Sequence, residues 1–386
     1  MIRQNFNADW TVEKGDGNSR MNSFLGNTQT KTVHLPYDAM IHEARTPDTK
    51  NGAQTGFYPG GEYIFQKHFT APQAWQGKPV SLVFEGVYQT ALVYLNGWLL
   101  TRNVNGYAEF TVEAGPYLKY GADNLLKVIA DNSLEPNSRW YTGSGIYRPV
   151  RLLVGNKVYL PQDTVRITTR EADEGFALLD VTAQVQSAST VTERVTLQQT
   201  ICRKGTAVLT DRQNLLLQPG ESRTVSFRYC VDSPALWSPE NPNLYTSTMQ
   251  VLEGEEELDR EETGFGIRTL SIDAAHGVRI NGQTVKLRGA CIHHDNGILG
   301  AATLPDAEER RIRQLKEAGF NAIRSSHHPA GRALLDACDR YGVLVMDELS
   351  DVWNVRKNPY DYALYFEQDW KPTIQKMVAK DYNHPS

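Results

Sequence analysis

The hydrophobic pattern of the chain changes once, close to Leu270, and this change limits the fold more than any other feature. Before it, short runs of alternating apolar and polar residues are separated by Gly, Pro, Asn and Asp, and helical periodicity is almost absent. After it, strand-like and helix-like runs follow one another. The pattern predicts β-sandwiches first and an α/β unit with a parallel sheet at the end.

We divide the β-rich part into residues 1–156, predicted to form a β-sandwich, and residues 157–268, predicted to form an immunoglobulin-like β-sandwich. In the first part, the pair Asn96-Gly97 lies between apolar runs and predicts a tight hairpin. In the second, runs such as "ALLDVTAQVQSA" and "RTVSFRYCV" predict strands with one buried face, and the proline-rich "PALWSPENPNLYT" is expected to bridge two of them.

Residues 269–386 carry the strand–helix alternation. A hairpin and a buried strand are expected at "VRINGQTVKLRGACIHHD", further strands at "NAIRSSHHP" and "VLVMDELSD", and helices at "DAEERRIRQLKEAGF" and "RALLDACDRYG". Asp306 is the expected N-cap of the first helix, Gly319 is expected to follow its end, and a last helix is expected over 365–381. Three parallel strands predict the start of a (β/α)8 barrel, which needs ~250 residues. We therefore expect the sequence to stop inside this domain.

Composition narrows the classes of function. The net charge is −5 and the pI about 6.0, so neither nucleic acid nor an anionic membrane is an expected partner. No apolar run approaches a membrane span, and the N-terminus has no apolar signal region, so a cytoplasmic protein is expected. Four scattered cysteines favour free thiols over a Cys202–Cys230 bond and give no zinc motif.

Titratable residues crowd the three predicted strand ends, where parallel α/β folds bind ligands. The first strand ends in His293-His294-Asp295, the second in "SSHH" at 325–328, and the third in Asp347-Glu348. Neighbours on a strand point to opposite faces, so at most one residue of each pair is expected to reach a pocket. Substrate contact and a satisfied core histidine both stay open for these rings. A zinc site is a third, weaker alternative, because no HxH spacing is present.

Adjacent acids on one strand cannot flank a scissile glycosidic bond, which needs two carboxyls ~5–9.5 Å apart. We therefore expect Asp347 and Glu348 to hold a histidine or arginine in place. A buried acid paired with Arg288 or Arg324 is favoured over direct substrate contact.

In the first domain, "PNSRWYTGSGIYRPVRL" places Trp140 and Tyr141 in a glycine-containing loop. Flat aromatic faces suit the C–H surfaces of sugar rings, and Asn137 and Arg139 are candidates to bond hydroxyl groups. For the aromatic residues, a structural corner at a domain interface is the favoured alternative.

Several of these motifs together resemble glycoside hydrolase family 2, which includes β-galactosidases and β-glucuronidases. "RWYTGSGIYRPV" is similar to the segment that closes the family's N-terminal sugar-binding domain, and "GFGIRTL" to its barrel entry. "LRGACIHHDNG", "NAIRSSHHP" and "GVLVMDE" resemble its first barrel strands. "KDYNHPS" resembles the stretch before its acid/base glutamate.

The resemblance implies a jelly-roll sugar-binding domain over residues 1–156, followed by the immunoglobulin-like sandwich and a TIM barrel. It implies a retaining β-glycosidase acting on terminal β-galactosides, with β-glucuronidase as the nearest alternative. It implies substrate binding by His293, His327, Asp347, Glu348, Asn137 and Arg139, with support from Arg324 and Trp140. Both catalytic glutamates are expected after Ser386, so the chain alone is expected to be inactive.

No cofactor is implied as a requirement. The Glu-x-His metal pattern of some family members is replaced by "DELSDVW", so the sequence supports no catalytic metal, although a divalent or monovalent cation stays open. The implied partner is an oligosaccharide or other β-glycoside, and a homo-oligomer stays open. Two alternatives belong to other classes: a non-catalytic carbohydrate-binding protein and a metal-dependent barrel hydrolase.

Overall fold

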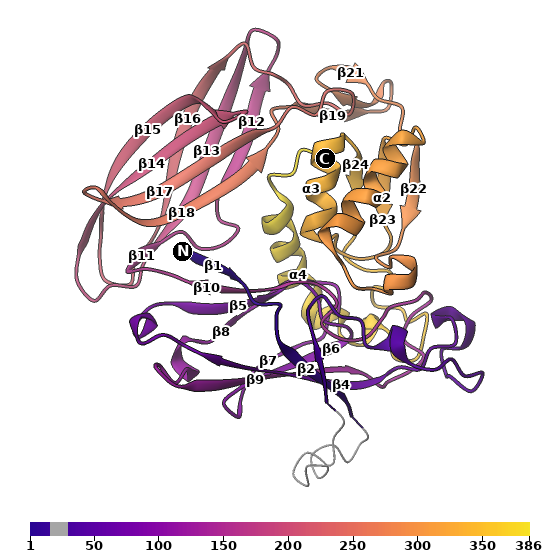
Figure 1. The fold of residues 1–386 in the computed structure, drawn as a ribbon. Helices are drawn as coiled ribbons and strands as arrows, with labels where there is room; N and C mark the ends of the chain where they lie inside the picture. The colour runs from indigo at the N-terminus through magenta and orange to yellow at the C-terminus, as the bar shows by residue number, and fades with distance from the viewer. Residues whose placement is uncertain (16–29) are drawn as a thin grey trace.

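A computed structural model describes residues 1–15 and 30–386 (Figure 1). The chain forms two β-sandwiches followed by an α/β body that lies beside both of them (Figure 1). No helix in these two stretches is long and apolar enough to cross a membrane.

The first sandwich consists of two antiparallel sheets. Its strands are β1 (Ile2–Asn5), β2 (Trp10–Lys14), β3 (Lys31–Val33), β4 (Gly61–Thr70), β5 (Val80–Phe84), β6 (Thr90–Leu95), β7 (Trp98–Asn103), β8 (Phe110–Glu113), β9 (Asp123–Asn132) and β10 (Val150–Val154). The sheets have the orders β1-β10-β5-β8 and β3-β2-β4-β9-β6-β7. Asn96 and Gly97 join β6 to β7 with φ of 52° and 90°, so the predicted tight hairpin is present.

The second sandwich is built from longer strands with the expected alternation of buried and exposed residues. They are β11 (Val158–Tyr159), β12 (Arg166–Ala172), β13 (Phe176–Ser187), β14 (Glu193–Arg203), β15 (Thr206–Leu217), β16 (Ser222–Asp232), β17 (Tyr245–Glu253) and β18 (Glu256–Phe265). One sheet pairs β11, β12 and β16 with β13, and the other has the order β15-β14-β17-β18. Cys202 and Cys230 are free thiols, as favoured.

The proline-rich segment bridges β16 and β17 and also fastens the third body to the second. Its Trp237 is fully buried, and the indole Nε1 donates a hydrogen bond to the Asp339 carbonyl at 3.0 Å. A buried indole N–H needs such an acceptor, so this bond fixes the relative position of the two bodies.

The third body begins with a hairpin sheet and continues as a parallel sheet with the order β22-β23-β24. Its elements are β19 (Leu270–Asp273), β20 (Gly277–Ile280), β21 (Gln283–Thr284), β22 (Gly289–Ile292), α2 (Pro305–Glu317), β23 (Ala322–Ser325), α3 (Arg332–Tyr341), β24 (Leu344–Met346) and α4 (Phe366–Asp381). The expected strand–helix alternation is therefore present.

Two details differ from expectation. Leu304, not Asp306, is the N-cap of α2, because Pro305 supplies the first helical residue and leaves Asp306 within the first turn. The strand β22 was expected to be buried, but its residues alternate between exposed and half-buried. Apolar residues beside this sheet, such as Leu287 (50% exposed) and Met346 (60% exposed), have no covering layer among the described residues.

Candidate active site

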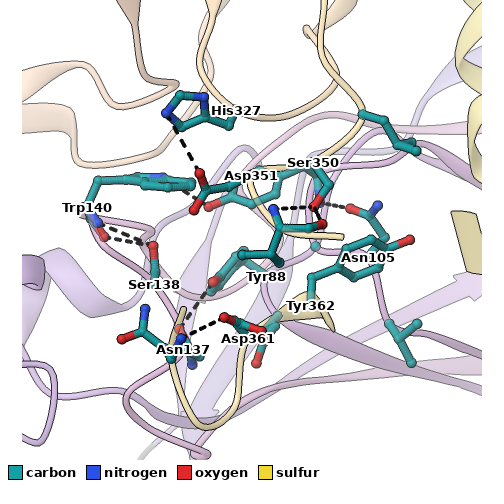
Figure 2. A pocket seen from close by; sticks show the side chains of 17 residues that line it. Tyr88, Asn105, Asn137, Ser138, Trp140, His327, Ser350, Asp351, Asp361 and Tyr362 are labelled. Carbon is teal, nitrogen blue, oxygen red and sulfur yellow. Dashed lines mark hydrogen bonds and ion pairs between the residues drawn. The ribbon is translucent and has the colours of Figure 1, made fainter. Parts of the chain in front are cut away.

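The carboxyl ends of the three parallel strands face the loop 137–145 of the first sandwich. Ile292 ends β22, Ser325 ends β23 and Met346 ends β24, so the polar residues that follow each strand meet at one edge of the sheet. Figure 2 shows the pocket at this junction, with His327 and Asp351 from the third body opposite Asn137, Ser138 and Trp140 from the first. The site therefore depends on contact between two bodies distant in sequence.

One histidine of each pair faces the Trp140 side. The imidazole of His293 stacks on Trp140 with ring centroids 4.7 Å apart and an interplanar angle of 10°. His327 lies 5.6 Å from the same indole and 6.0 Å from His293. The two rings that the resemblance assigned to the sugar site are thus brought together with an aromatic face.

The other two histidines are core residues. His294 Nε2 donates a hydrogen bond to the Thr142 carbonyl at 2.9 Å, and His328 stacks on Tyr107 with ring centroids 4.4 Å apart. Burial lowers the pKa of His294 to about 3 and the pKa of His328 well below its usual value, so both rings are neutral near pH 7. Substrate contact and a core role were both left open for the histidines, and His294 and His328 have the core role.

Glu348 holds both a histidine and an arginine. Its Oε2 is 2.8 Å from His327 Nδ1, and its Oε1 accepts a hydrogen bond from Arg324 Nε. The hydrogen bond to Glu348 raises the pKa of Arg324. This is the arrangement expected from the sequence, with Arg324 rather than Arg288 as the partner.

Asp347 was also expected to hold a histidine or arginine, but among the described residues its carboxyl accepts from backbone N–H groups instead. It accepts a hydrogen bond from the Ala330 backbone N–H at 2.9 Å, and its Oδ2 is out of contact with water. Burial, followed by the nearby charge of Asp381, raises its pKa to about 7. The two neighbouring carboxyls therefore lie in different environments, Glu348 beside His327 and Arg324 and Asp347 beside the Ala330 backbone. They do not face one another across a pocket.

Asn137 is in the pocket wall, but its amide is bonded to other residues of the first sandwich. Its Nδ2 donates to Asn132 Oδ1 and to the Leu134 carbonyl, both at 2.7 Å, and its Oδ1 accepts from the Tyr88 hydroxyl at 3.2 Å. These bonds use both donors of the amide. The side chain shapes the loop that carries Ser138.

Arg139 reaches across to the third body. Its Nε and Nη2 donate to the two carboxylate oxygens of Asp351 at 3.0 and 2.6 Å. Lys357 Nζ donates to the same carboxylate at 2.8 Å, and His327 Nε2 is 3.9 Å from it. Burial alone would raise the pKa of Asp351, but the bonds from Arg139 and Lys357 outweigh it and lower the pKa. Sequence reasoning missed Asp351, although it follows the Asp347-Glu348 strand by only three residues.

The two aromatic residues of the loop have different roles. Trp140 faces the pocket, and its Nε1 donates to the Tyr107 hydroxyl at 3.2 Å. Tyr141 instead donates to Asp38 Oδ2 at 2.6 Å, and Asp38 also accepts from the Ala301 backbone N–H at 2.9 Å. Tyr141 therefore has the structural role at a domain interface that was predicted for both aromatic residues.

One His/Asp group among the described residues is compact enough to hold a metal ion, and none of its residues lines the pocket of Figure 2. It consists of Asp336, Asp339 and His384. His384 Nδ1 is 2.6 Å from Asp339 Oδ2, and the Ser386 backbone N–H donates to Asp339 Oδ1 at 3.1 Å. These polar atoms thus already join the end of the chain to α3.

Three protein-family models together match nearly the whole chain. Residues 10–176 match the glycosyl hydrolase 2 galactose-binding domain-like model, residues 158–268 the glycosyl hydrolases family 2 model, and residues 274–386 the family 2 TIM barrel domain model. The chain belongs to glycosyl hydrolase family 2. The resemblance and the three-part fold class expected from the sequence are confirmed.

Relatives of this family 2 chain include β-galactosidases and β-glucuronidases. It is 37% identical to beta-galactosidase BoGH2A of Bacteroides ovatus, over all of this chain and 45% of that protein. It is 32% identical to a putative beta-glucuronidase of Formosa agariphila, over all of this chain and 36% of that protein. A family 2 structure from Bacteroides cellulosilyticus superposes with a TM-score of 0.95 at 37% identity, over 100% of this chain and 51% of that one. The chain thus spans about half the length of these relatives, or less.

Proposed function

We propose that the protein to which this chain belongs is a retaining β-glycosidase that removes terminal β-galactosyl units. The observation that carries the proposal is the placement of His293 and His327 beside the face of Trp140 at the carboxyl ends of parallel strands. A sugar has one face of C–H groups and an edge of hydroxyl groups. The pocket wall offers the imidazole of His327 and the indole of Trp140, one face of which is covered by His293.

Internal bonds fix which imidazole nitrogen is left for a substrate. His293 Nδ1 is 2.6 Å from the Ser326 carbonyl, and His327 Nδ1 is 2.8 Å from Glu348. Both acceptors require a proton on Nδ1. In a neutral ring, Nε2 then carries a lone pair that accepts a hydrogen bond from a sugar hydroxyl, and at His327 this nitrogen also lies 3.9 Å from the Asp351 carboxylate.

Bond cleavage in the proposed reaction is a double displacement. One glutamic acid protonates the leaving oxygen while another glutamate attacks the anomeric carbon, and water then hydrolyses the glycosyl-enzyme. We place both glutamates after Ser386, so residues of this chain bind and orient the sugar without turning it over. On this proposal no cofactor is required.

A β-galactoside is favoured by the relationship to the Bacteroides ovatus enzyme. The second candidate is a β-glucuronide, favoured by the Formosa agariphila relative and by the cations Arg139 and Lys357 near the pocket. Both cations, however, are paired with Asp351, so neither is free to bind a uronate carboxylate. We therefore propose a neutral sugar.

The test compares the full-length protein with the chain ending at Ser386, both verified by mass, on chromogenic β-galactoside, β-glucuronide, β-glucoside and β-mannoside. We expect the full-length protein to prefer the galactoside and the shorter chain to show no turnover. Preference for the glucuronide would replace the sugar assignment. No turnover by either protein, with saccharide binding retained, would favour a non-catalytic carbohydrate-binding protein.

The remaining assignments are also proposals. We propose domain boundaries of 1–156, 157–268 and 269–386, a cytoplasmic location, and a β-glycoside as the principal partner. Gel filtration of the full-length protein with light scattering would decide whether it forms a homo-oligomer.

A further inference from the structure

The segment after β24 and the start of α4 carry three large aromatic rings in a row. The rings of Trp353 and Phe366 are 6.5 Å apart with an interplanar angle of 15°, and those of Phe366 and Trp370 are 6.3 Å apart with an angle of 18°. Phe366 and Trp370 are four residues apart on α4, which places them on one side of the helix. We call Trp353, Phe366 and Trp370 the aromatic row.

The aromatic row is unusually open to solvent. Trp353 is 67% exposed and Trp370 is 39% exposed. Exposed tryptophans that stand singly need no explanation, but a cluster of exposed aromatic rings is an apolar patch of the kind that marks a binding site. Phe366 is stacked with both tryptophans, and the two indoles are more exposed than the phenyl ring between these contacts.

The aromatic row continues the wall of the candidate active site. Val352, next to Trp353, and Tyr362 both line the pocket that contains His327. The ring of Tyr362 lies edge-on to Phe366 at 6.2 Å, so one side chain connects the pocket to the row. Figure 2 shows Tyr362 at the lower side of that pocket, near Asp361.

Fixed neighbours hold the row in place. The Tyr362 hydroxyl donates to Asp369 Oδ2 at 2.6 Å, and the Thr373 hydroxyl donates to the same oxygen at 2.9 Å. Tyr365 lies under the guanidinium of Arg102 from the first sandwich, 5.3 Å from the ring centroid. The stretch 362–373, which carries Phe366 and Trp370, is therefore held to the first sandwich through β7, and this limits its movement before a ligand binds.

We propose that the aromatic row binds the outer sugar units of a β-linked oligosaccharide whose terminal unit occupies the pocket. The inference rests on the proposed glycosidase function and specifies its substrate class as an oligosaccharide rather than a small glycoside. The C–H faces of successive pyranose rings pack on the ring faces, to which aromatic quadrupoles attract positively polarised hydrogens. No ionic group of the ligand is needed for this contact.

The test uses the full-length protein and the variant Trp353→Ala, with Trp98→Ala as the matched control. Trp98 lies on the first sandwich, is 66% exposed and contacts Tyr117, so it resembles Trp353 in exposure but lies outside the row.

The substrates to be compared are an aryl β-glycoside with one sugar and an oligosaccharide of at least three units with the same terminal sugar. We expect Trp353→Ala to raise KM for the oligosaccharide about fivefold, the loss of one aromatic contact, and to change KM for the aryl glycoside less than twofold. Trp98→Ala should change neither.

Two results would overturn the proposal. An equal loss on both substrates with a lowered Tm would mean that the remainder of the full-length protein covers the row and uses it as core. An unchanged KM on both substrates would mean that no sugar contacts Trp353. Failure of the proposed function is a separate result, because it would appear as absent turnover of every aryl glycoside by the unmodified protein.

Discussion

Arg139 and Asp351 lie 212 positions apart in the chain and form a two-point ion pair, with Arg139 Nε 3.0 Å and Nη2 2.6 Å from the two carboxylate oxygens. The pair joins the Trp140 loop of the first sandwich to the loop after β24. Because Asp351 also lies 3.9 Å from His327 Nε2, this contact fixes the distance between the aromatic face and the imidazole that we assign to the sugar.

We expect Arg139→Ala to reduce kcat/KM of the full-length protein about tenfold, since a displaced loop misplaces Trp140. Stability should change by less than ~1 kcal/mol, because the arginine side chain is 42% exposed. Arg139→Lys supplies charge without the two-point geometry and should recover only part of the activity. Steady-state kinetics and thermal unfolding measure the two effects. Equal activities of the Ala variant and the unmodified protein would remove the positioning role.

Glu348→Gln should reduce kcat/KM about 10²-fold by releasing His327 and Arg324 from the positions that Glu348 fixes. Glutamine keeps the shape but accepts through only one oxygen and carries no charge. The measurement is kcat/KM together with Tm, and Asp306→Asn on the exposed first turn of α2 serves as the control. A drop in unfolding free energy as large as the free energy calculated from the loss in kcat/KM would mean that the Glu348 carboxylate has a purely structural role.

Within the first histidine pair, we expect His294→Ala to lower mainly stability and His293→Ala to lower mainly activity. His294→Ala removes a fully enclosed ring and its bond to Thr142, and should cost about 2–4 kcal/mol of unfolding free energy. His293→Ala removes a half-exposed ring that stacks on Trp140, and should lower activity with little change in Tm. Denaturant unfolding and kinetics on both variants test this. The assignment of faces is wrong if His293→Ala is the more destabilising change.

Asp347 should make the folded chain less stable as pH rises. Its folded pKa is about 7 against an ordinary 3.8, so between these values the folded state holds a proton that the unfolded state has lost. More protons bound to the folded state means that the unfolding free energy falls as pH increases through this window. Asp347→Asn removes this contribution and should flatten the change in Tm between pH 4.5 and 7. Parallel profiles for Asp347→Asn and the unmodified protein would contradict the raised pKa.

The sequence by itself determined the order of the elements, because strand and helix periodicities depend on neighbouring residues. It gave the two sandwiches, the Asn96-Gly97 turn, the parallel unit and the family. It also predicted that the two histidines of each pair would face different ways, although both pairs lie just past the ends of β22 and β23 and not on the strands themselves.

Only the tertiary structure decided which distant side chains meet. The partner of Arg139 is 212 residues away, and the difference between Trp140 in the pocket and Tyr141 on Asp38 depends on how the first sandwich packs against the barrel strands. Burial decided the rest: the same residue type is a core group at His294 and a half-exposed ring stacked on Trp140 at His293, because desolvation and partners come from other segments. A sequence pattern fixes the direction of a side chain, whereas its neighbours are fixed only when the bodies pack together.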